Sequence, residues 1–357
     1  MIFLNYFIPL ISFILSVISV PFIIKYGTIF NYIDYPNVRK QHTAPLVRIG
    51  GLSIFFSILI PILFCISTTK NLNFENKEFI VILFSSFLIF ILGFIEDRST
   101  LSFNIRLSIQ FLIAIFTWYF GFQIRLEPLL EIIKINPNLE IFNFLSLMVT
   151  TFFIVGTTNA INWLDGLDGL SSQISLVVLA SFLALVLPFS SEVLVIWLCL
   201  SMIGSILGFL FHNSYPSTIL MGDCGSNFIG FTLSLIAIYF SNNLFQENLG
   251  TNTLYIYSPL FLLSLPILDM FYVICKRLLK NLSPFKPDRN HLHFRILKFG
   301  FSYNNTVTLI TFIAALISTI VFKIFDQDLI LLFKILFIIF FIKTIFQKKI
   351  IKYFLFD

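Results

Sequence analysis

Residues 193–211 read VLVIWLCLSMIGSILGFLF, a run of 19 residues with no charged side chain. A helix of about 20 apolar residues crosses the hydrocarbon core of a bilayer, so this stretch predicts a membrane span. Ten further runs share its character, at 3–24, 47–67, 79–94, 107–121, 142–155, 172–187, 227–240, 255–275, 307–322 and 329–342. We therefore expect an all-α, polytopic integral membrane protein with about eleven transmembrane helices, forming a single domain over residues 1–357.

The composition excludes a soluble globular domain. Of the 357 residues, 58% are hydrophobic and 11% are charged, whereas soluble domains are about 45–50% apolar and about 25% charged. The formal net charge of +5 argues for no nucleic-acid partner, and the partner that the composition implies is the lipid bilayer. The four cysteines lie far apart with no CxxC pair, so they suggest neither a disulfide framework nor a zinc cluster.

The distribution of lysine and arginine predicts the orientation. Seventeen of the 23 basic residues fall after the first, third, fifth, seventh and ninth runs or in the C-terminal tail, and four fall in the loops of the other side. Positively charged loops face the cytoplasm. We therefore expect a multi-pass protein of the cell membrane with the N-terminus outside and the C-terminus in the cytoplasm. The dense polar clusters all fall on the cytoplasmic side, which predicts an active site there.

The first polar cluster is NAINWLDGLDGL at 159–170. It has an amide or a carboxylate at every third position, at Asn159, Asn162, Asp165 and Asp168. Three such steps drift by about half a turn on a helix of 3.6 residues per turn, so a straight helix cannot bring all four to one ion. The glycines at 166 and 169 allow the backbone to break there. Amide and carboxylate oxygens suit Mg²⁺, and helix capping alone is the alternative interpretation.

Two further clusters are acidic. In MGDCGSNFIG at 221–230, glycines flank Asp223 and permit close approach to a phosphate, with Asp223 as a metal ligand; a turn with a helix cap is the alternative. In GFIEDRSTLS at 93–102, the adjacent carboxylates Glu96 and Asp97 repel each other, which suits a base or a pair held by cations. A solvated loop in which they pair with Arg98 is the alternative.

The remaining clusters are basic. DRNHLHFRI at 288–296 has two histidines beside arginines, without the further ligands that a zinc site needs, so contact with phosphate is the more natural interpretation. A positive-inside anchor is the alternative. DYPNVRKQHTAPLVRIGG at 34–51 also suits a phosphate-bearing ligand. The candidate residues in these two stretches, with one that follows the seventh run, are Asp288, His291, His293, Arg295, Arg39, Lys40, His42 and Asn213.

Taken in order, these five stretches resemble the polyprenyl-phosphate N-acetylhexosamine-1-phosphate transferases (glycosyltransferase family 4). The likeness covers most of the chain, from about residue 34 to about residue 300, and includes LPILDM around Asp269. RKxH after the first run and the absence of an HHHFE-like run favour the undecaprenyl-phosphate GlcNAc-1-phosphate transferase branch. The resemblance implies ten or eleven spans and transfer of a sugar 1-phosphate from a UDP-sugar to a polyprenyl phosphate, with release of UMP and use of Mg²⁺ or Mn²⁺. A homodimer is a further possible partner arrangement.

The resemblance also implies roles for the residues. Asp223 and Asn162 would hold the metal, and Asp97 with Glu96 would lie near the lipid phosphate. The nucleotide pocket would be shaped by Asp165 and Asp168, and phosphate would be contacted by His291, His293 and Arg295. The remaining substrate-binding candidates are Asn159, Arg39, Lys40, His42, Asn213 and Asp288.

Two positions depart from the family pattern. Glu96 stands where the family usually has the first of two aspartates, and Phe294 stands where it often has histidine. Asp97 is therefore the expected base or positioning acid, and Arg295 is left to supply positive charge.

Three other functions remain open at this point. The donor sugar could be another UDP-N-acetylhexosamine. A transporter would instead place its polar residues near the bilayer midplane, on broken helices, and here they gather on one side. A catalytically inactive protein of the same fold is the third, because of Glu96 and Phe294.

Overall fold

A computed structural model describes residues 2–36, 44–68, 77–99, 101–135, 138–187, 193–246, 253–284, 288–325 and 327–347. Its helices are α1 (Ile2–Ile29), α2 (Gly51–Thr68), α3 (Lys77–Arg98), α4 (Phe103–Tyr119), α5 (Glu127–Ile132), α6 (Leu139–Leu164), α7 (Leu170–Val186), α8 (Val193–Asn213), α9 (Gly222–Gln246), η1 (Thr253–Tyr257), α10 (Ser258–Phe261), α11 (Ser264–Leu278), α12 (Leu292–Lys298), α13 (Tyr303–Ile324) and α14 (Leu329–Gln347). The two strands described, β1 (Ile33–Asp34) and β2 (Leu46–Val47), pair antiparallel. The all-α class is therefore confirmed.

Each of the eleven apolar runs contains a helix, and the protein is a multi-pass membrane protein. Among the described residues six helices, α1, α3, α6, α8, α9 and α13, are long and apolar enough to cross a bilayer. A seventh candidate is a broken one, because η1 and α10 meet α11 at an angle of 71°. Pro266 lies in the first turn of α11, where its missing N–H costs nothing, whereas a continuous helix would lose a hydrogen bond there. The count of eleven spans stays a prediction.

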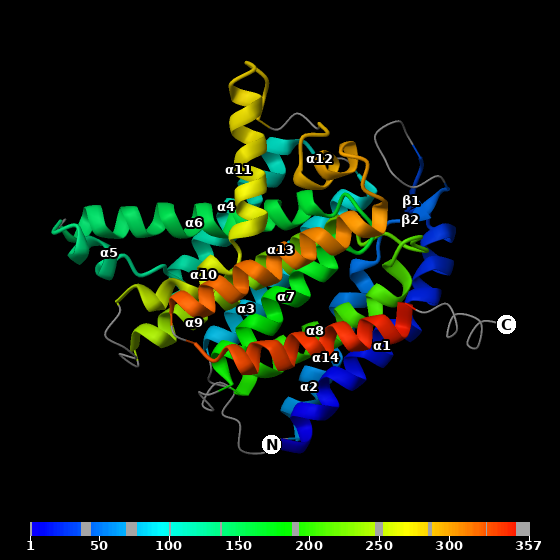
Figure 1. Cartoon of the computed structure of the whole chain (residues 1–357), viewed down its shortest axis with the longest axis horizontal. Coiled ribbons are helices and arrows are strands. Elements are labelled where there is room, and N and C mark those ends of the chain that lie inside the picture. The colour runs from blue at the N-terminus through cyan, green and yellow to red at the C-terminus, as the bar shows by residue number, and fades with distance from the viewer. Residues whose placement is uncertain are drawn as a thin grey trace.

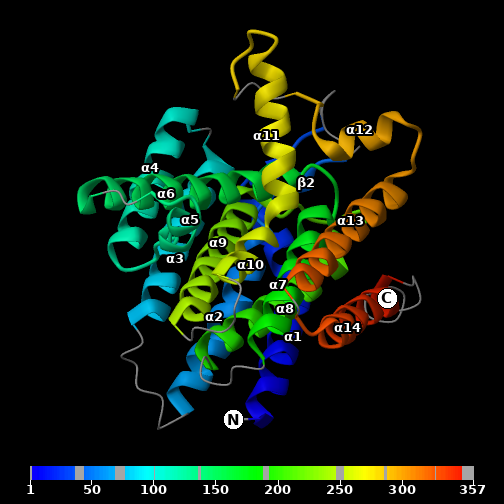
Figure 2. The same cartoon turned by 60° about the vertical axis from the view of Figure 1, so that its left-hand side comes forward.

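Helix α9 lies inside the bundle, and Figure 2 shows it between α3 and α7. Its membrane-spanning window is entirely buried, and it packs against α2, α3, α6, α7 and α10. Small residues allow these close contacts: a Cβ added to Gly225 would lie 2.9 Å from the Cα of Gly51 on α2, and one added to Gly230 would lie 2.9 Å from the Cα of Thr158 on α6. The neighbouring helices thus fix the position of α9.

Helix α1 packs along α8 in the same manner. A Cβ added to Gly204 would lie 2.1 Å from the carbonyl oxygen of Pro9, and one added to Gly208 would lie 2.5 Å from that of Phe13. Small residues four apart are the usual means of close helix contact in membranes. A hydrogen bond of 2.9 Å joins the hydroxyl of Ser12 on α1 to a serine hydroxyl on α8.

The strand pair and the short helix α12 lie at one end of the bundle. Figures 1 and 2 show α12 and the far end of α11 on the same side of the molecule as the β1–β2 pair, away from the N-terminus. The first residues of α9 are joined to this end by the strand pair, because Leu220 donates its backbone N–H to Val47 of β2. The polar clusters found in the sequence therefore meet around the start of α9.

We expect Gly204→Ala to lower the melting temperature of the detergent-purified protein by a few degrees, because overpacking of a filled contact costs about 1–3 kcal/mol. Gly156→Ala on α6 is the matched control, since its added Cβ meets only the flexible end of Met270, at 3.6 Å. Equal melting temperatures for the two variants would contradict the close α1–α8 contact.

Candidate active site

The turn between α6 and α7 displays the Asn and Asp side chains of the first cluster. Helix α6 runs nine residues beyond the predicted run 142–155 and ends at Leu164, with Asp165 as its C-cap. Gly169, at φ +72°, starts α7, so the predicted break at the glycines is confirmed. Asp168 accepts a hydrogen bond from the backbone N–H of Ser217 at 3.0 Å. This bond ties the turn to the segment that precedes α9.

The N-terminus of α9 is held by a carboxylate from another helix. Asp97 of α3 accepts hydrogen bonds from the backbone N–H groups of Asp223, at 2.8 Å, and Cys224, at 2.9 Å. Its side chain is 0% exposed. A negative charge at this position also interacts favourably with the helix dipole. Asp97 therefore fixes the backbone from which the Asp223 side chain projects.

Arg48, which follows β2, links three acidic side chains. Its Nε donates to Asp97 at 3.1 Å and its Nη2 donates to Asp223 at 2.9 Å. Its Nη1 lies 3.9 Å from a carboxylate oxygen of Asp34 on β1. The strand pair brings Asp34 and Arg48 together, because Asp34 is in register with Leu46. One guanidinium thus balances part of the charge of three carboxylates.

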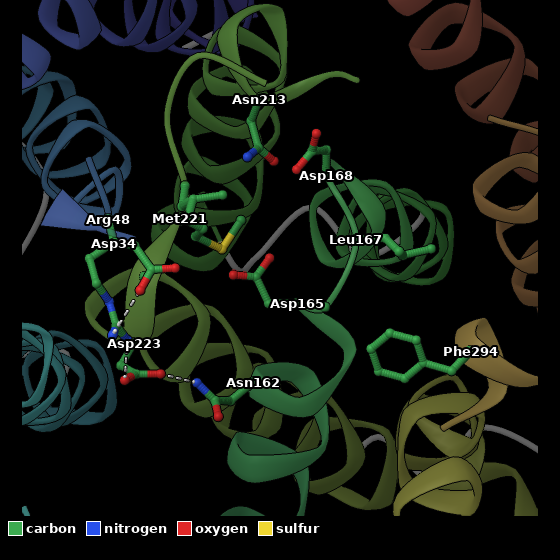
Figure 3. A pocket seen from close by; sticks show the side chains of 13 residues that line it. Asp34, Arg48, Asn162, Asp165, Leu167, Asp168, Asn213, Met221, Asp223 and Phe294 are labelled. Atoms are coloured by element: carbon green, nitrogen blue, oxygen red, sulfur yellow. Dashed lines mark hydrogen bonds and ion pairs between the residues drawn. The ribbon is translucent and has the colours of Figure 1, made fainter. Parts of the chain in front are cut away.

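Asn162 on α6 completes the contact with α9. Its amide Nδ2 donates to the Oδ1 of Asp223 at 2.7 Å and to the hydroxyl of Ser226 at 2.8 Å. Two stretches whose residues Asn162 and Asp223 lie 61 positions apart in sequence therefore meet directly. Figure 3 shows the Arg48–Asp223–Asn162 chain of contacts along one wall of a cavity.

The cavity has a volume of about 300 Å³. Asp168 and Asn213 lie on the opposite side of the cavity from Asp223, and Asp165 lies between Asp223 and that pair (Figure 3). The lining residues are Asp34, Arg48, Asn162, Asp165, Gly166, Leu167, Asp168, Asn213, Leu220, Met221, Gly222, Asp223 and Phe294. Four of these are acidic and one is basic, so the cavity favours a bound cation.

The charge of Asp165 reflects this surplus of carboxylates. Burial, together with the nearby charges of Asp223 and Asp168, raises the pKa of Asp165 to about 8, although the hydroxyl of Ser171 donates a hydrogen bond to it. Asp165 therefore carries a proton through much of the neutral range, and a cation in the cavity would favour its ionised form.

The residues fit a magnesium ion that is shared with a substrate. Asp223 offers a carboxylate, and Asn162 lies beside it with its amide Nδ2 donating to the Oδ1 of Asp223, so a rotation of the amide would turn the oxygen of Asn162 toward a metal held by Asp223. Mg²⁺ is usually held by one or two carboxylates, with waters and substrate phosphates as its other ligands. The described residues contain no group of three histidine, cysteine or acidic side chains placed to hold a metal without a substrate. The donor set therefore suits a metal that arrives with a phosphate.

Seven of the predicted residues that the structure describes do not line the cavity, namely Glu96, Asp97, Asn159, Asp288, His291, His293 and Arg295. Three of these, Glu96, Asn159 and Asp288, have partners on α4 or α11. Glu96 accepts a hydrogen bond from Arg106 of α4 at 2.7 Å. Asn159 donates to Gln110 of α4 at 2.6 Å. Asp288 accepts from the Nε of Arg277 at 2.9 Å, and this contact, with hydrogen bonds from Asn290, outweighs burial and lowers the pKa of Asp288 to about 2.

The histidines lie behind the 165–169 turn. His293 is 0% exposed, and burial lowers its pKa to about 3, so its ring is neutral. A Cβ added to Gly166 would lie 2.5 Å from its Nε2. The ring of His291 stacks on the ring of His293, with 5.7 Å between the ring centroids. Phe294, where the family often has histidine, is the one residue of α12 that reaches the cavity wall.

Sequence reasoning missed several residues of the site. Arg48 and Asp34 lay within the quoted stretch 34–51, but Asp34 is the one acidic residue of that stretch and lies 14 positions before Arg48, so no local spacing indicated that the two would meet. Tyr303, whose hydroxyl meets the backbone N–H of Asp168, carried no signal in the sequence. Three predicted residues, Arg39, Lys40 and His42, lie outside the described residues.

Comparison with known proteins gives the same assignment. Residues 79–241 match the family model of glycosyl transferase family 4. The chain is 32% identical over 322 residues, 88% of its length and 84% of the relative, to the probable undecaprenyl-phosphate N-acetylglucosaminyl 1-phosphate transferase of Bacillus subtilis (strain 168). It is 30% identical over 295 residues, 81% of its length and 75% of the relative, to the undecaprenyl-phosphate alpha-N-acetylglucosaminyl 1-phosphate transferase of Escherichia coli (strain K12).

The helical fold and the acidic cavity thus occur in a membrane-bound sugar-phosphate transferase. The chain belongs to glycosyl transferase family 4. The resemblance inferred from the five motifs is confirmed, and the chain is an enzyme rather than a transporter.

We expect Gly222→Ala to disrupt the start of α9. Gly222 has φ +75°, and an added Cβ would lie 1.8 Å from the carbonyl oxygen of Arg48. Gly300→Ala is the matched control, because Gly300 has φ +87° with nothing within 4 Å. Both variants carry the left-handed backbone cost of about 1–2 kcal/mol. Gly222→Ala should therefore lower the melting temperature clearly more than Gly300→Ala does, and equal losses would contradict the packing at Gly222.

Proposed function

We propose that the protein transfers N-acetylglucosamine 1-phosphate from UDP-GlcNAc to undecaprenyl phosphate, giving undecaprenyl-diphospho-GlcNAc and UMP. The printed names of the relatives support this donor and this acceptor. The observation that carries the proposal is the meeting of Asp223 with Asn162, at 2.7 Å, in a cavity lined by acidic residues and one arginine. Such a cavity can take a diphosphate together with Mg²⁺, which we propose as the cofactor, with Mn²⁺ as its substitute.

The chemistry is a phosphoryl transfer. An oxygen of the lipid phosphate bonds to the β-phosphorus of the donor, the bond from that phosphorus to the bridging oxygen breaks, and UMP leaves with the bridging oxygen. Such transfers depend on positioning and on neutralisation of charge. The second pKa of a phosphate monoester is about 6, so the acceptor is mostly a dianion at neutral pH. A strong protein base is therefore unnecessary.

Five of the cavity residues have a proposed role in this reaction. Asp223 and Asn162 hold the metal, which neutralises charge on the diphosphate when it is bound. Arg48 carries positive charge beside Asp223 and adds to the neutralisation. The nucleotide end of the pocket is formed by Asp165 and Asp168, whose backbone turn is fixed from both sides.

Asp97 is proposed as a positioning acid rather than as a base. Its two oxygens accept two backbone N–H groups and the guanidinium of Arg48, and its side chain is 0% exposed. Proton transfer to it would weaken the cap of α9. The proposed roles of Glu96, His291, His293 and Arg295 in substrate contact, and of Asn159, Asn213 and Asp288 in binding, remain as the sequence predicted them.

We expect membranes that contain the protein to form undecaprenyl-diphospho-GlcNAc and UMP from UDP-GlcNAc, undecaprenyl phosphate and Mg²⁺. Asp223→Asn should reduce turnover by at least about 100-fold, since it removes a carboxylate aimed at the metal. Glu131→Gln, at an exposed position on α5, is the control and should match the wild type. Mass spectrometry of the lipid product reads the result, and wild-type turnover in Asp223→Asn would refute the metal assignment.

The same assay decides the donor. Offered singly, UDP-GlcNAc should give more product than other UDP-N-acetylhexosamines, and preference for another sugar would move the proposal to that donor with the reaction unchanged.

The orientation is also a proposal, with the N-terminus outside and the site in the cytoplasm. We expect Lys298→Cys, at the exposed end of α12, to react with a membrane-impermeant maleimide only after cells are permeabilised. Leu139→Cys, at the opposite end of α6 from the site and 74% exposed, should react in intact cells. Both are made in a Cys275→Ser background, because the other three cysteines are buried. The reverse labelling would contradict this orientation.

A further inference from the structure

Asp269 on α11 is a buried carboxylate that binds α12. Its side chain is 3% exposed. Its Oδ1 accepts the backbone N–H of Leu292 at 2.8 Å, and the Nη2 of Arg295 lies 3.6 Å from the same oxygen. The residue at the N-cap of α12, His291, makes no side-chain capping bond of its own. Asp269 therefore caps α12 from a neighbouring helix, as Asp97 caps α9.

The other oxygen of Asp269 engages the histidine. Its Oδ2 lies 3.0 Å from the Nδ1 of His291. A carboxylate only accepts hydrogen bonds, so Nδ1 must carry the proton of this contact. The Nε2 of His291 is then the ring atom left for a ligand. A carboxylate that selects the protonated nitrogen of a histidine in this way also fixes the direction in which the ring points.

The surroundings hold the ring in one plane. His291 packs edge-on against Trp163 at 5.4 Å and stacks on His293 at 5.7 Å, with an interplanar angle of 6°. Trp163 directly follows the proposed metal ligand Asn162 in α6. Among the described residues, the charged groups around this cluster include Asp269 itself, Arg295 from α12, Arg277 from α11, whose guanidinium lies 5.1 Å from the Trp163 ring, and Asp288, which pairs with Arg277.

We propose that Asp269 is a positioning residue for the transfer reaction: it acts through His291, keeping the proton on Nδ1 and so leaving the unprotonated Nε2 as the ring atom available to a ligand. This inference rests on the proposed function, because it deepens the role given there to His291. The 71° bend between α10 and α11 sets the direction of α11, on which Asp269 contacts the start of α12.

Asp269→Asn separates the capping role from the positioning role. The asparagine carbonyl oxygen can still accept the N–H of Leu292, so the cap of α12 is kept. Its amide then faces Nδ1 of His291 as a donor, and Nδ1 must give up its proton to accept. A purely structural Asp269 would therefore tolerate Asn, whereas a positioning Asp269 would not.

The first measurement is kinetic. We expect Asp269→Asn to lower kcat by about 10- to 100-fold, the range found when the partner that orients a functional histidine is removed, with little change in melting temperature. In a His291→Ala background the same substitution should have no further effect. The matched control is Asp328→Asn, which also caps a helix, through Ile330 and Leu331 of α14, and should keep wild-type kcat.

The second measurement needs no substrate. The chain has only four histidines, so ¹⁵N-histidine NMR of the purified protein can assign the His291 signals by their loss in His291→Ala. We expect a protonated Nδ1 in the wild type and an unprotonated Nδ1 in Asp269→Asn.

The two readouts separate the inference from the proposed function. Wild-type kcat in Asp269→Asn, an additive loss in the double variant, or an unchanged Nδ1 would each overturn the role of Asp269. A wild-type protein that transfers no sugar phosphate from any UDP-sugar would overturn the proposed function instead, and the NMR measurement would still decide whether Asp269 sets the protonated nitrogen of His291.

Discussion

The hydrogen bonds from the start of α9 to Asp97 are the interaction on which the rest of the site depends. The first N–H groups of a helix have no partner within the helix, and leaving a buried donor unpaired costs about 1–3 kcal/mol. Asp97 accepts two of them at once and is itself shielded from solvent. The helix that carries Asp223 is thereby fixed to α3, and Arg48 compensates the charge that this arrangement buries.

A second pair of helices repeats this arrangement, and that repetition explains how distant stretches form one site. Asp269 holds α12 to α11 as Asp97 holds α9 to α3. In both cases a carboxylate on one helix accepts backbone N–H at the start of another, two N–H groups for Asp97 and one for Asp269. The contacts between stretches are therefore polar and directional, whereas the apolar packing of the bundle is not. Directional contacts are what set the side-chain geometry that a phosphoryl transfer requires.

Much of this could be predicted from the sequence. The apolar runs located the helices, and the spacing of Asn162 and Asp165 with the following glycines located the break after α6. The separate partners of Glu96 and Asp97 could not be predicted. Adjacent residues on a helix point about 100° apart, and only the packing of α3 shows that Glu96 contacts α4 whereas Asp97 contacts α9. The bend before α11 was missed for a related reason, since Pro266 alone does not fix the angle.

The most direct test of this account is an experimental structure with Mn²⁺ and UDP bound, in which anomalous scattering locates the metal. The account requires the metal on Asp223 and the side-chain oxygen of Asn162, with Asp97 still accepting the backbone N–H groups of residues 223 and 224. A metal bound by Asp97, with the start of α9 released from it, would contradict the account.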